Sequence, residues 1–375
     1  MVHASWVAES EPRFTGPTLR REIVGGKERT MADFFNPSNY VRNVFRLTKM
    51  PGNVQTSHWY DNMRMTRFVR TSHARIHNYV FGSSLINHYG KFGYNCDGKV
   101  SEIEFNGRNA QFHALYDRQF KNGYEFETAV LITRLTKGSK VFYDVGANWG
   151  YFSLLVASLP NFHGQIFAFE PNPTAYSDLN STVQQAGLEQ RITALNYGLG
   201  CVEGDLHLEE VEEFKTGLAR LSSSGSGRKV PMNTLDSLKL HPPDVIKIDA
   251  EGMESDILTG GERMLKEHRP FVVFENFLRF DDPNQTWSPL SILKDKGYRV
   301  FNPALIFRCD SGPVLASFGD PIESMLEFDP NPKTALIETT VTNRFLMRHQ
   351  LNLFACHESR FSELSIDEFV HIAGF

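Results

Sequence analysis

Acidic and small residues gather at one point of the sequence in a pattern that suits a cationic ligand. Asp144 follows an apolar run, and Gly146, Asn148 and Gly150 come next, before a second apolar run begins. Two glycines let the backbone turn tightly and approach a ligand closely. A phosphate would use the backbone N–H groups of such a turn, but the aspartate would repel it. The pattern therefore favours a ligand that carries a positive charge and no phosphate.

Glu170 adds a second part to this candidate site. It ends the next apolar run, 20 residues after Gly150, and an acid at that place in a βαβ unit accepts hydrogen bonds from the ribose hydroxyls of a nucleoside. S-adenosylmethionine (AdoMet) has a ribose, a positive sulfonium and a charged amino group, and it has no phosphate. A nicotinamide cofactor fits less well, because its pyrophosphate would lie beside Asp144. A glycine-rich strand-to-helix turn without any ligand is the structural alternative.

More ionisable side chains follow two later apolar runs. Lys247 and Asp249 point to one face of an expected strand, because strand side chains alternate. They could form an ion pair aimed at the site or a purely structural pair. Glu275 and Asn276 end the next run, and with Asp249 they supply hard oxygen ligands that would suit Mg²⁺. The magnesium site is not the favoured interpretation, and no metal ligand is assigned.

The elements that must position these residues alternate between strands and helices from about residue 121 onward. Strands are expected at "KVFYDVG", "QIFAFEP", "RITALNYGLG", "DVIKIDAEG", "PFVVFEN", "YRVFN" and "LNLFAC". Helices are expected at residues 151–159, 175–186, 254–266 and 290–296. This alternation predicts a parallel sheet wrapped by helices, with the ligand outside the carboxyl ends of the strands. The Ser/Gly-rich segment 222–227 is expected to be a mobile loop, either a lid or a plain surface excursion.

The chain divides into three regions by composition. Residues 1–33 are polar with Gly and Pro breaks and are expected to form a flexible leader. Residues 34–120 form an accessory region of helices and a short β element, and residues 121–375 form the main domain. Residues 34–100 hold nine Lys and Arg but only two Asp and Glu, a net charge of +7 that leaves -12 for the rest of the chain, since the total is -5. We interpret this basic stretch as a solvated helical face whose aromatic residues pack inward, with a surface for an anionic substrate or nucleic acid as the alternative.

The bulk composition limits the class of protein. Hydrophobic residues make up 41% of the 375 residues and charged residues 22%, as in globular proteins. The four cysteines are far apart and form no CxxC pair, which indicates reduced thiols and not a disulfide or zinc framework. Neither a secretory signal nor an apolar run long enough to cross a bilayer is visible. A cytoplasmic location is therefore expected.

Five segments resemble, in order and spacing, the FkbM-type AdoMet-dependent methyltransferases: "DVGANWGYFS", "FAFEPNP", "VPMNTLDSL", "DVIKIDAEGMESDILTGG" and "RPFVVFEN". The resemblance covers residues 121–300 and, more weakly, the C-terminal strands, but not the first 120 residues. It implies the class I methyltransferase fold, which is an α/β, Rossmann-like fold with a seven-stranded, mostly parallel sheet and helices on both faces. Here an N-terminal accessory region precedes that fold. The resemblance also implies methyl transfer to oxygen, commonly to a hydroxyl of a sugar, glycan or secondary metabolite.

The resemblance implies a first set of cofactor contacts around the glycine turn. The methionine end of AdoMet would lie against Asp144, Gly146, Asn148 and Gly150. Glu170 would hold the ribose.

A second set of candidates lies at the other strand ends and upstream of the turn. Asn196 ends the third strand, where such enzymes often contact adenine, and Glu127 in "YEFE" resembles a family glutamate near the methionine amine. A solvent-facing helix position is the alternative for Glu127. Transfer to an alcohol also requires a group that removes its proton, and the catalytic candidates are Asp249, Lys247 and Glu275.

The sequence therefore predicts an AdoMet-dependent O-methyltransferase with a small-molecule or glycan acceptor, no nucleic-acid partner and no membrane span. A nicotinamide-linked oxidoreductase and a non-catalytic AdoMet-binding module are the alternatives, and assembly as a homo-oligomer is left open. The accessory region is expected to cover the acceptor pocket directly or through a subunit contact. On that view, removal of residues 1–110 would leave AdoMet binding nearly intact. If the region instead supports the sheet, AdoMet binding would be lost with it.

Overall fold

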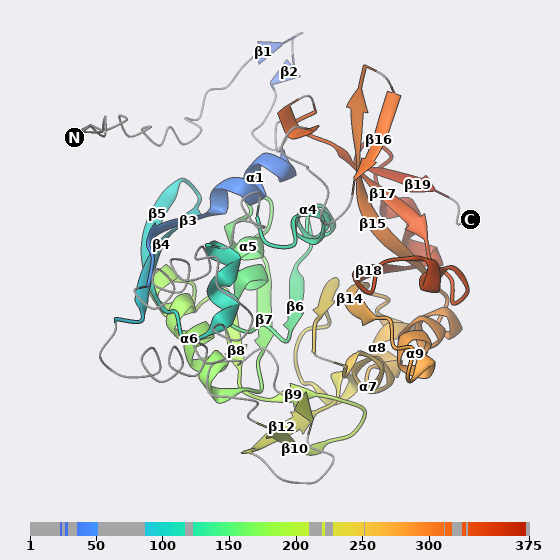
Figure 1. The fold of residues 1–375 in the computed structure, drawn as a ribbon, viewed down its shortest axis with the longest axis horizontal. Helices are drawn as coiled ribbons and strands as arrows, with labels where there is room; N and C mark the ends of the chain where they lie inside the picture. Colours follow the sequence, from blue (N-terminus) through green and yellow to red (C-terminus); the bar gives the residue numbers. More distant parts are fainter. Residues whose placement is uncertain are drawn as a thin grey trace, which may run out of the picture. The chain divides into compact units, whose positions relative to one another are not determined.

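The structure is a computed structural model, and the fold is shown in Figure 1. It describes residues 23–24, 27–28, 36–51, 87–116, 123–209, 220–221, 228–250, 252–310, 312–316, 325–327 and 329–372. The chain divides into two compact units, Met1–Phe35 and Asn36–Phe375. The described part of the first unit is a two-stranded antiparallel sheet of β1 (Ile23–Val24) and β2 (Lys27–Glu28).

The second unit is built on one large sheet with the order β19-β17-β15-β18-β14-β13-β6-β7-β8, in which β16 also pairs with β15. Five neighbouring strands are parallel, and β18 is antiparallel to both β14 and β15. These seven strands have the order of the class I methyltransferase fold, so the predicted fold is confirmed. Their bounds are β6 (Val141–Val145), β7 (Gln165–Phe169), β8 (Ile192–Leu195), β13 (Val245–Ile248), β14 (Phe271–Phe277), β15 (Tyr298–Cys309) and β18 (Gln350–His357).

The described sheet is wider than the seven predicted strands. Three further strands extend the edge at β15, and they are β16 (Gly312–Ala316), β17 (Lys333–Glu338) and β19 (Phe369–Ile372). The expected third strand also divides, because β8 stays in the large sheet while β9 (Gly198–Leu199) joins a second one. That second sheet contains β10 (Gly204–Glu209), β11 (Arg220–Leu221) and β12 (Arg228–Asn233). The expected loop 222–227 lies outside the described residues.

Helices cover both faces of the large sheet (Figure 1). On one side lie α4 (Phe126–Leu135), α5 (Tyr151–Ser158) and α6 (Pro173–Ala186), and on the other lie α7 (Glu254–Thr259), α8 (Glu262–Glu267) and α9 (Pro283–Asp295). The helix expected at 254–266 is divided into α7 and α8 at Gly260 and Gly261. A Cβ at Gly260 would lie 2.0 Å from the carbonyl oxygen of Gly200, so only glycine fits there. Among the described helices, none has the length and apolar character needed to cross a membrane.

The described part of the accessory region belongs to the same compact unit as the main sheet. It contains α1 (Pro37–Val44), β3 (Phe45–Lys49), β4 (Tyr89–Cys96), β5 (Lys99–Asn106) and the 3-10 helix η2 (Ala110–Leu115). The ring of Trp149, just before α5, lies 5.8 Å from that of Phe92 and 4.7 Å from that of Phe112. Most arginines of the basic stretch, Arg64, Arg67, Arg70 and Arg75, lie outside the described residues.

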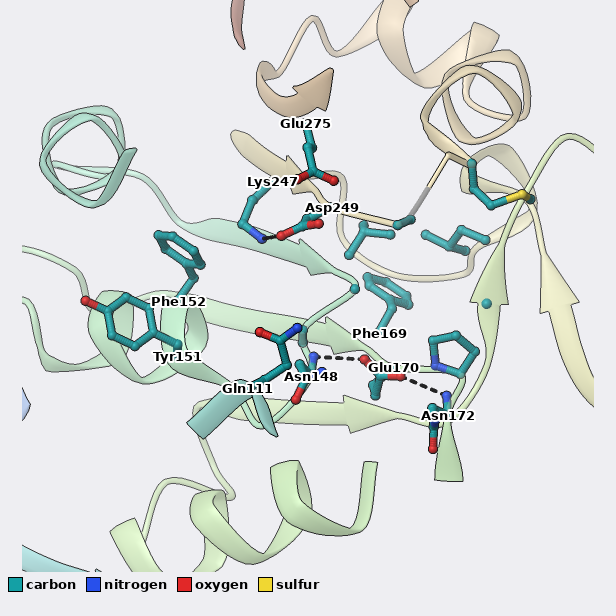
Figure 2. A pocket seen from close by; sticks show the side chains of 18 of the residues that line it. Gln111, Asn148, Tyr151, Phe152, Phe169, Glu170, Asn172, Lys247, Asp249 and Glu275 are labelled. Atoms are coloured by element: carbon teal, nitrogen blue, oxygen red, sulfur yellow. Dashed lines mark hydrogen bonds and ion pairs between the residues drawn. The ribbon is translucent and has the colours of Figure 1, made fainter. Parts of the chain in front are cut away.

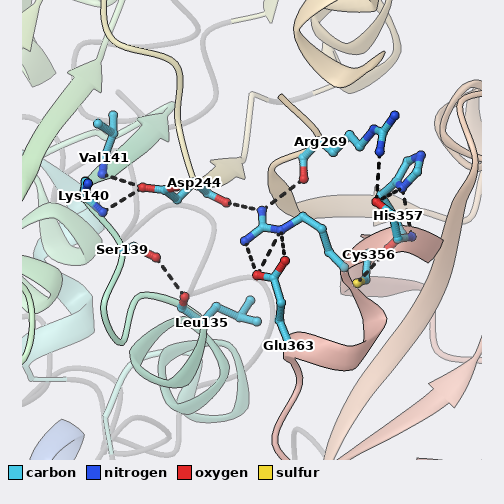
Figure 3. A network of polar contacts seen from close by, with 11 residues as sticks. Leu135, Ser139, Lys140, Val141, Asp244, Arg269, Cys356, His357 and Glu363 are labelled. Atoms are coloured by element: carbon cyan, nitrogen blue, oxygen red, sulfur yellow. Dashed lines mark hydrogen bonds and ion pairs between the residues drawn. The ribbon is translucent and has the colours of Figure 1, made fainter. Parts of the chain in front are cut away.

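A polar network joins the amino ends of the strands (Figure 3). The carboxylate of Asp244 accepts the N–H groups of Lys140 (2.7 Å) and Val141 (3.0 Å). Arg360 donates to the carbonyls of Asp244 and Arg269 and forms an ion pair with Glu363 at 2.8 Å. These contacts stabilise the end of the sheet from which the strands start, which leaves their carboxyl ends for the site.

Phe92→Ala is expected to lower the free energy of unfolding of the second unit by about 3–5 kcal/mol, because Phe92 is fully buried beside Trp149. Denaturant titration followed by circular dichroism and by tryptophan fluorescence should show coincident transitions. Val100→Ala, on exposed β5, is the matched control and should cost less than about 1 kcal/mol. If one of the two signals changed at a lower denaturant concentration than the other, the accessory region and the main sheet would not unfold as one unit.

Candidate active site

A cavity lies at the carboxyl ends of β6, β7, β13 and β14, where the fold class places its ligand (Figure 2). Its wall is formed by the turn after β6, the residues that end the other three strands, and Gln350 of β18. Gln111, Tyr124 and Glu125 complete it from upstream of the first core strand. The wall therefore combines segments that are far apart in the sequence.

The backbone N–H groups of the glycine turn are paired within the protein. Those of Gly146 and Ala147 donate to the carbonyl of Phe169 (2.9 and 3.0 Å), that of Asn148 donates to Glu170 (2.8 Å), and that of Gly150 donates to the carbonyl of Ala147 (2.8 Å). Gly146 has φ +78°, and a Cβ there would lie 1.8 Å from the carbonyl oxygen of Asp249. Only glycine fits this position. Because these four donors are engaged, the turn offers little to a phosphate.

Glu170 lies in the cavity wall as predicted, and it also holds the turn together. Its two carboxylate oxygens accept the N–H groups of Asn148 and Asn172, each at 2.8 Å (Figure 2). Burial raises the pKa of Glu170 to about 7, although both N–H bonds act in the opposite direction. Each oxygen keeps a second lone pair for a ligand hydroxyl.

Lys247 is the centre of the charged part of the wall. Its ammonium lies 2.9 Å from the carboxylate of Asp249, so the predicted ion pair is present. The Lys247 side chain is 3% exposed, and its Nζ lies 4.6 Å from the centre of the Phe152 ring. Burial alone would lower the pKa of Lys247, but Asp249, Asp144 and Glu125 together raise it above its ordinary value. A raised pKa favours the protonated ammonium, which donates hydrogen bonds.

Asp144 is placed behind the cavity and not in its wall. It is 1% exposed, accepts the hydroxyl of Ser153 at 2.7 Å, and lies opposite Lys247 in the register of β6 and β13. Burial raises the pKa of Asp144, and Lys247 lowers it. Asp144 is therefore not among the residues that line the cavity, and its charge acts on the lining residue Lys247.

Two other sequence candidates support the wall from outside. Gly150 begins α5 with φ 93°, and a Cβ there would lie 2.7 Å from the Leu179 side chain. The side-chain amide of Asn196 donates to the carbonyls of Glu170 (2.8 Å) and Pro171 (3.2 Å). The residue next to it, Tyr197, lines the cavity instead.

In "YEFE" the structure brings Glu125, and not Glu127, into the cavity. The helix α4 begins at Phe126, so Glu127 lies in its buried first turn while Glu125 precedes the helix with φ 43°. The Glu125 carboxylate accepts the amide of Asn352 at 2.9 Å, and burial raises its pKa to about 7, against the lowering effect of Lys247. The sequence shows two glutamates in this segment, but it does not show at which residue the helix begins, and so it does not decide which glutamate reaches the cavity.

The three proposed magnesium ligands do not come together. Glu275 faces the cavity and accepts the amide of Gln350, whereas Asn276 points to the opposite face of β14. There its side chain donates to the carbonyl of Thr286 (3.0 Å) and accepts from Arg344 (2.6 Å). Across the described part of the chain, no group of three His, Cys, Asp or Glu side chains could hold a metal ion. The geometry thus separates Asn276 from the site by the ordinary alternation of a strand.

Comparisons with known proteins find similarity to methyltransferases. The family model described as "Methyltransferase FkbM domain" matches residues 144–300. The hexuronic acid methyltransferase AglP of Haloferax volcanii is 30% identical over 138 residues, which are 36% of this chain and 55% of that protein. The chain thus spans only about half the length of this curated relative.

Two solved structures are similar at low identity. The FkbM methyltransferase of Methylobacillus flagellatus is 16% identical with a TM-score of 0.33, over 59% of this chain and 44% of that one. The precorrin-6y C5,15-methyltransferase of Geobacter metallireducens is 18% identical with a TM-score of 0.34, over 63% and 88%. At these TM-scores the likeness adds no argument to the strand order.

Glu125→Gln is expected to stabilise the ligand-free protein at pH 8 by about 1–3 kcal/mol and to leave it nearly unchanged at about pH 4, below the pKa of the unfolded state. The folded state raises the pKa of Glu125 from 4.5 to about 7, so it binds more protons than the unfolded state and loses stability as the pH rises through this window. Urea titrations at both pH values measure the difference, with Glu104→Gln on exposed β5 as the control. A variant that is less stable than the wild type at pH 8 would contradict the interpretation that burial of the ionised Glu125 carboxylate destabilises the fold.

Proposed function

We propose that this chain, which carries a methyltransferase FkbM domain in residues 144–300, is an AdoMet-dependent O-methyltransferase. Its acceptor would be a hydroxyl of a sugar, glycan or secondary metabolite. The name of the relative from Haloferax volcanii supports a sugar-like acceptor. The match covers only part of that relative, so the activity and acceptor of the whole protein are proposals.

One observation carries the choice of cofactor. The glycine turn uses the N–H groups of residues 146, 147, 148 and 150 internally, and the described cavity wall holds four carboxylates against one ammonium. The carboxylates are those of Glu125, Glu170, Asp249 and Glu275. A cavity with this surplus of negative charge favours a cation, and a turn that engages these four N–H groups internally disfavours a phosphate. AdoMet satisfies both conditions, whereas the pyrophosphate of a nicotinamide cofactor satisfies neither.

The residues of the wall suggest how AdoMet would be held. Glu170 would accept its ribose hydroxyls, and the adenine would lie against the apolar surface of Phe169, Pro171 and Tyr197. The cationic end would lie toward Glu125 and Asp249. When bound, AdoMet supplies a methyl group that its positive sulfur already activates. Asp144, Gly150 and Asn196 would then act on the cofactor indirectly, by fixing the residues that touch it.

The proton of the acceptor hydroxyl would go to one of two carboxylates. Asp249 and Glu275 both face the cavity and are the favoured acceptors, because neighbouring carboxylates raise the pKa of the third candidate, Lys247. Lys247 would instead hold Asp249 in place at 2.9 Å. Gln350, exposed at the mouth, would keep Glu275 oriented. The protein therefore needs only to position the hydroxyl and to remove its proton.

The alternative of a non-catalytic AdoMet-binding module and the cytoplasmic location are also proposals. A non-catalytic AdoMet-binding module would keep the cavity but would not need Asp249 or Glu275. The four described cysteines are free thiols, which supports the proposed cytoplasmic location.

Calorimetry should show that the wild-type protein binds AdoMet and does not bind NAD⁺. Glu170→Gln is expected to weaken AdoMet binding by about 1.5–3 kcal/mol, because it removes a charged acceptor for the ribose. Glu189→Gln, at an exposed position after α6, is the control. Thermal unfolding must be compared, since Glu170 also holds two backbone N–H groups. Tight NAD⁺ binding without AdoMet binding would refute the proposed cofactor.

With methyl-labelled AdoMet and a panel of neutral glycosides and polyols, the label is expected in ether linkages that resist mild alkali. Asp249→Asn and Glu275→Gln identify the proton acceptor, whose loss should lower kcat by about 10²–10⁴ while AdoMet affinity is kept. Label in an alkali-labile ester would show transfer to a carboxylate and not to a hydroxyl. AdoMet binding with no transfer in any variant or substrate would favour the binding module.

A further inference from the structure

The residues of the matched domain do not show which group would bind the carboxylate of the proposed cofactor. AdoMet carries a carboxylate on its methionine end, and this anion must lie in a wall dominated by carboxylates. Among the described lining residues, Lys247 is the only basic one, and Asp249 already pairs with it. In the glycine turn, the N–H groups of residues 146, 147, 148 and 150 are engaged within the protein. A neutral donor must therefore be sought elsewhere in the wall.

Gln111 is such a donor, and it comes from the accessory region, outside the matched residues 144–300. Its backbone is fixed on two sides. Its N–H donates to the side chain of Asn109 at 3.0 Å, and its carbonyl accepts the indole N–H of Trp149 at 3.1 Å. Figure 2 shows the side-chain amide of Gln111 toward the middle of the cavity, between Asn148 and Asp249.

Asn109 ties this segment to the glycine turn. It is 2% exposed, and its side-chain amide donates to Asn148 and to Asp178, each at 2.9 Å. Asn148 has φ 48°, a left-handed conformation that costs energy for residues other than glycine, although asparagine adopts it more readily than most. Its N–H is held by Glu170 and its side-chain oxygen by Asn109. The accessory segment thus holds the same residue of the turn that Glu170 holds.

We propose that the side-chain amide of Gln111 donates a hydrogen bond to the methionine carboxylate of bound AdoMet, and that Asn109 is a positioning residue of the same cofactor site, acting through Asn148. The inference rests on the proposed function. An amide can bind an anion without neutralising the carboxylates that attract the sulfonium and the amino group. An arginine or lysine at position 111 would instead pair with those carboxylates. The accessory segment then forms part of the cofactor site and does more than cover the acceptor.

The test compares two ligands that differ only in the methionine end. S-adenosylhomocysteine carries the amino acid group, and methylthioadenosine has the same nucleoside and thioether without it. Gln111→Ala is expected to weaken S-adenosylhomocysteine binding roughly tenfold or more. Its effect on methylthioadenosine should stay within about twofold, because that ligand has no carboxylate. Gln184→Ala, on the exposed surface of α6, is the control and should change neither affinity.

The outcomes separate this inference from the proposed function. An equal loss for both ligands would mean that Gln111 only supports the structure, and unchanged binding of S-adenosylhomocysteine would also overturn the contact. If the wild type bound neither ligand, the proposed function itself would fail. Selective loss for S-adenosylhomocysteine supports the contact, because a merely structural role would not distinguish the ligands.

The positioning role of Asn109 has its own test. Asn109→Ala is expected to weaken S-adenosylhomocysteine binding roughly tenfold, since Asn148 loses a support of its left-handed conformation. Adding Asn148→Gly should restore most of the affinity, because glycine adopts positive φ without support. A loss that persists in the double variant would contradict positioning through Asn148. Circular dichroism and thermal unfolding establish whether each variant is folded. If Asn109→Ala does not fold, the comparison of the two ligands with Gln111→Ala still tests the contact.

Discussion

The site depends on one buried ammonium group among several carboxylates. Lys247 lies at the carboxyl end of β13, almost without exposure, and its charge stabilises Asp249, Asp144 and Glu125. Ionised carboxylates cannot be buried together at low cost unless a cation accompanies them. Lys247 is that cation in the described wall, but it does not neutralise the whole negative charge, since four lining carboxylates face one ammonium. The remaining negative charge is what a cationic ligand would neutralise.

The backbone of the glycine turn is held by hydrogen bonds and close packing within the protein. Its N–H groups bond to Phe169, Glu170 and the turn itself, and Gly146 lies against the carbonyl of Asp249. The same short segment therefore joins β6, β7 and the end of β13. This close packing explains why a glycine-rich turn follows an acid here without forming a phosphate cradle. Recognition of a ligand is left to side chains, which suits a nucleoside without phosphate.

The accessory region is part of the fold that presents the site. Trp149 packs its ring on Phe112 and donates to the carbonyl of Gln111, and Asn109 bonds to Asn148. These contacts favour the alternative in which the region supports the sheet, so its removal is expected to disturb the glycine turn. Its described part also supplies Gln111 to the cavity wall. The boundary of the matched domain at residue 144 is therefore not the boundary of the site.

The sequence by itself predicted a parallel sheet wrapped by helices, the glycine turn, Glu170 and the Lys247–Asp249 pair, because local patterns of apolar periodicity and alternation carry that information. The class I strand order was implied only by the family resemblance. Only the tertiary structure decided that Glu125 enters the cavity in place of Glu127, since the start of α4 depends on packing. It also placed Asp144 behind Lys247 and brought Gln111 and Gln350 to the same wall. Contacts between segments up to about 240 residues apart arise from the closing of the sheet and its covering layers, which no local pattern specifies.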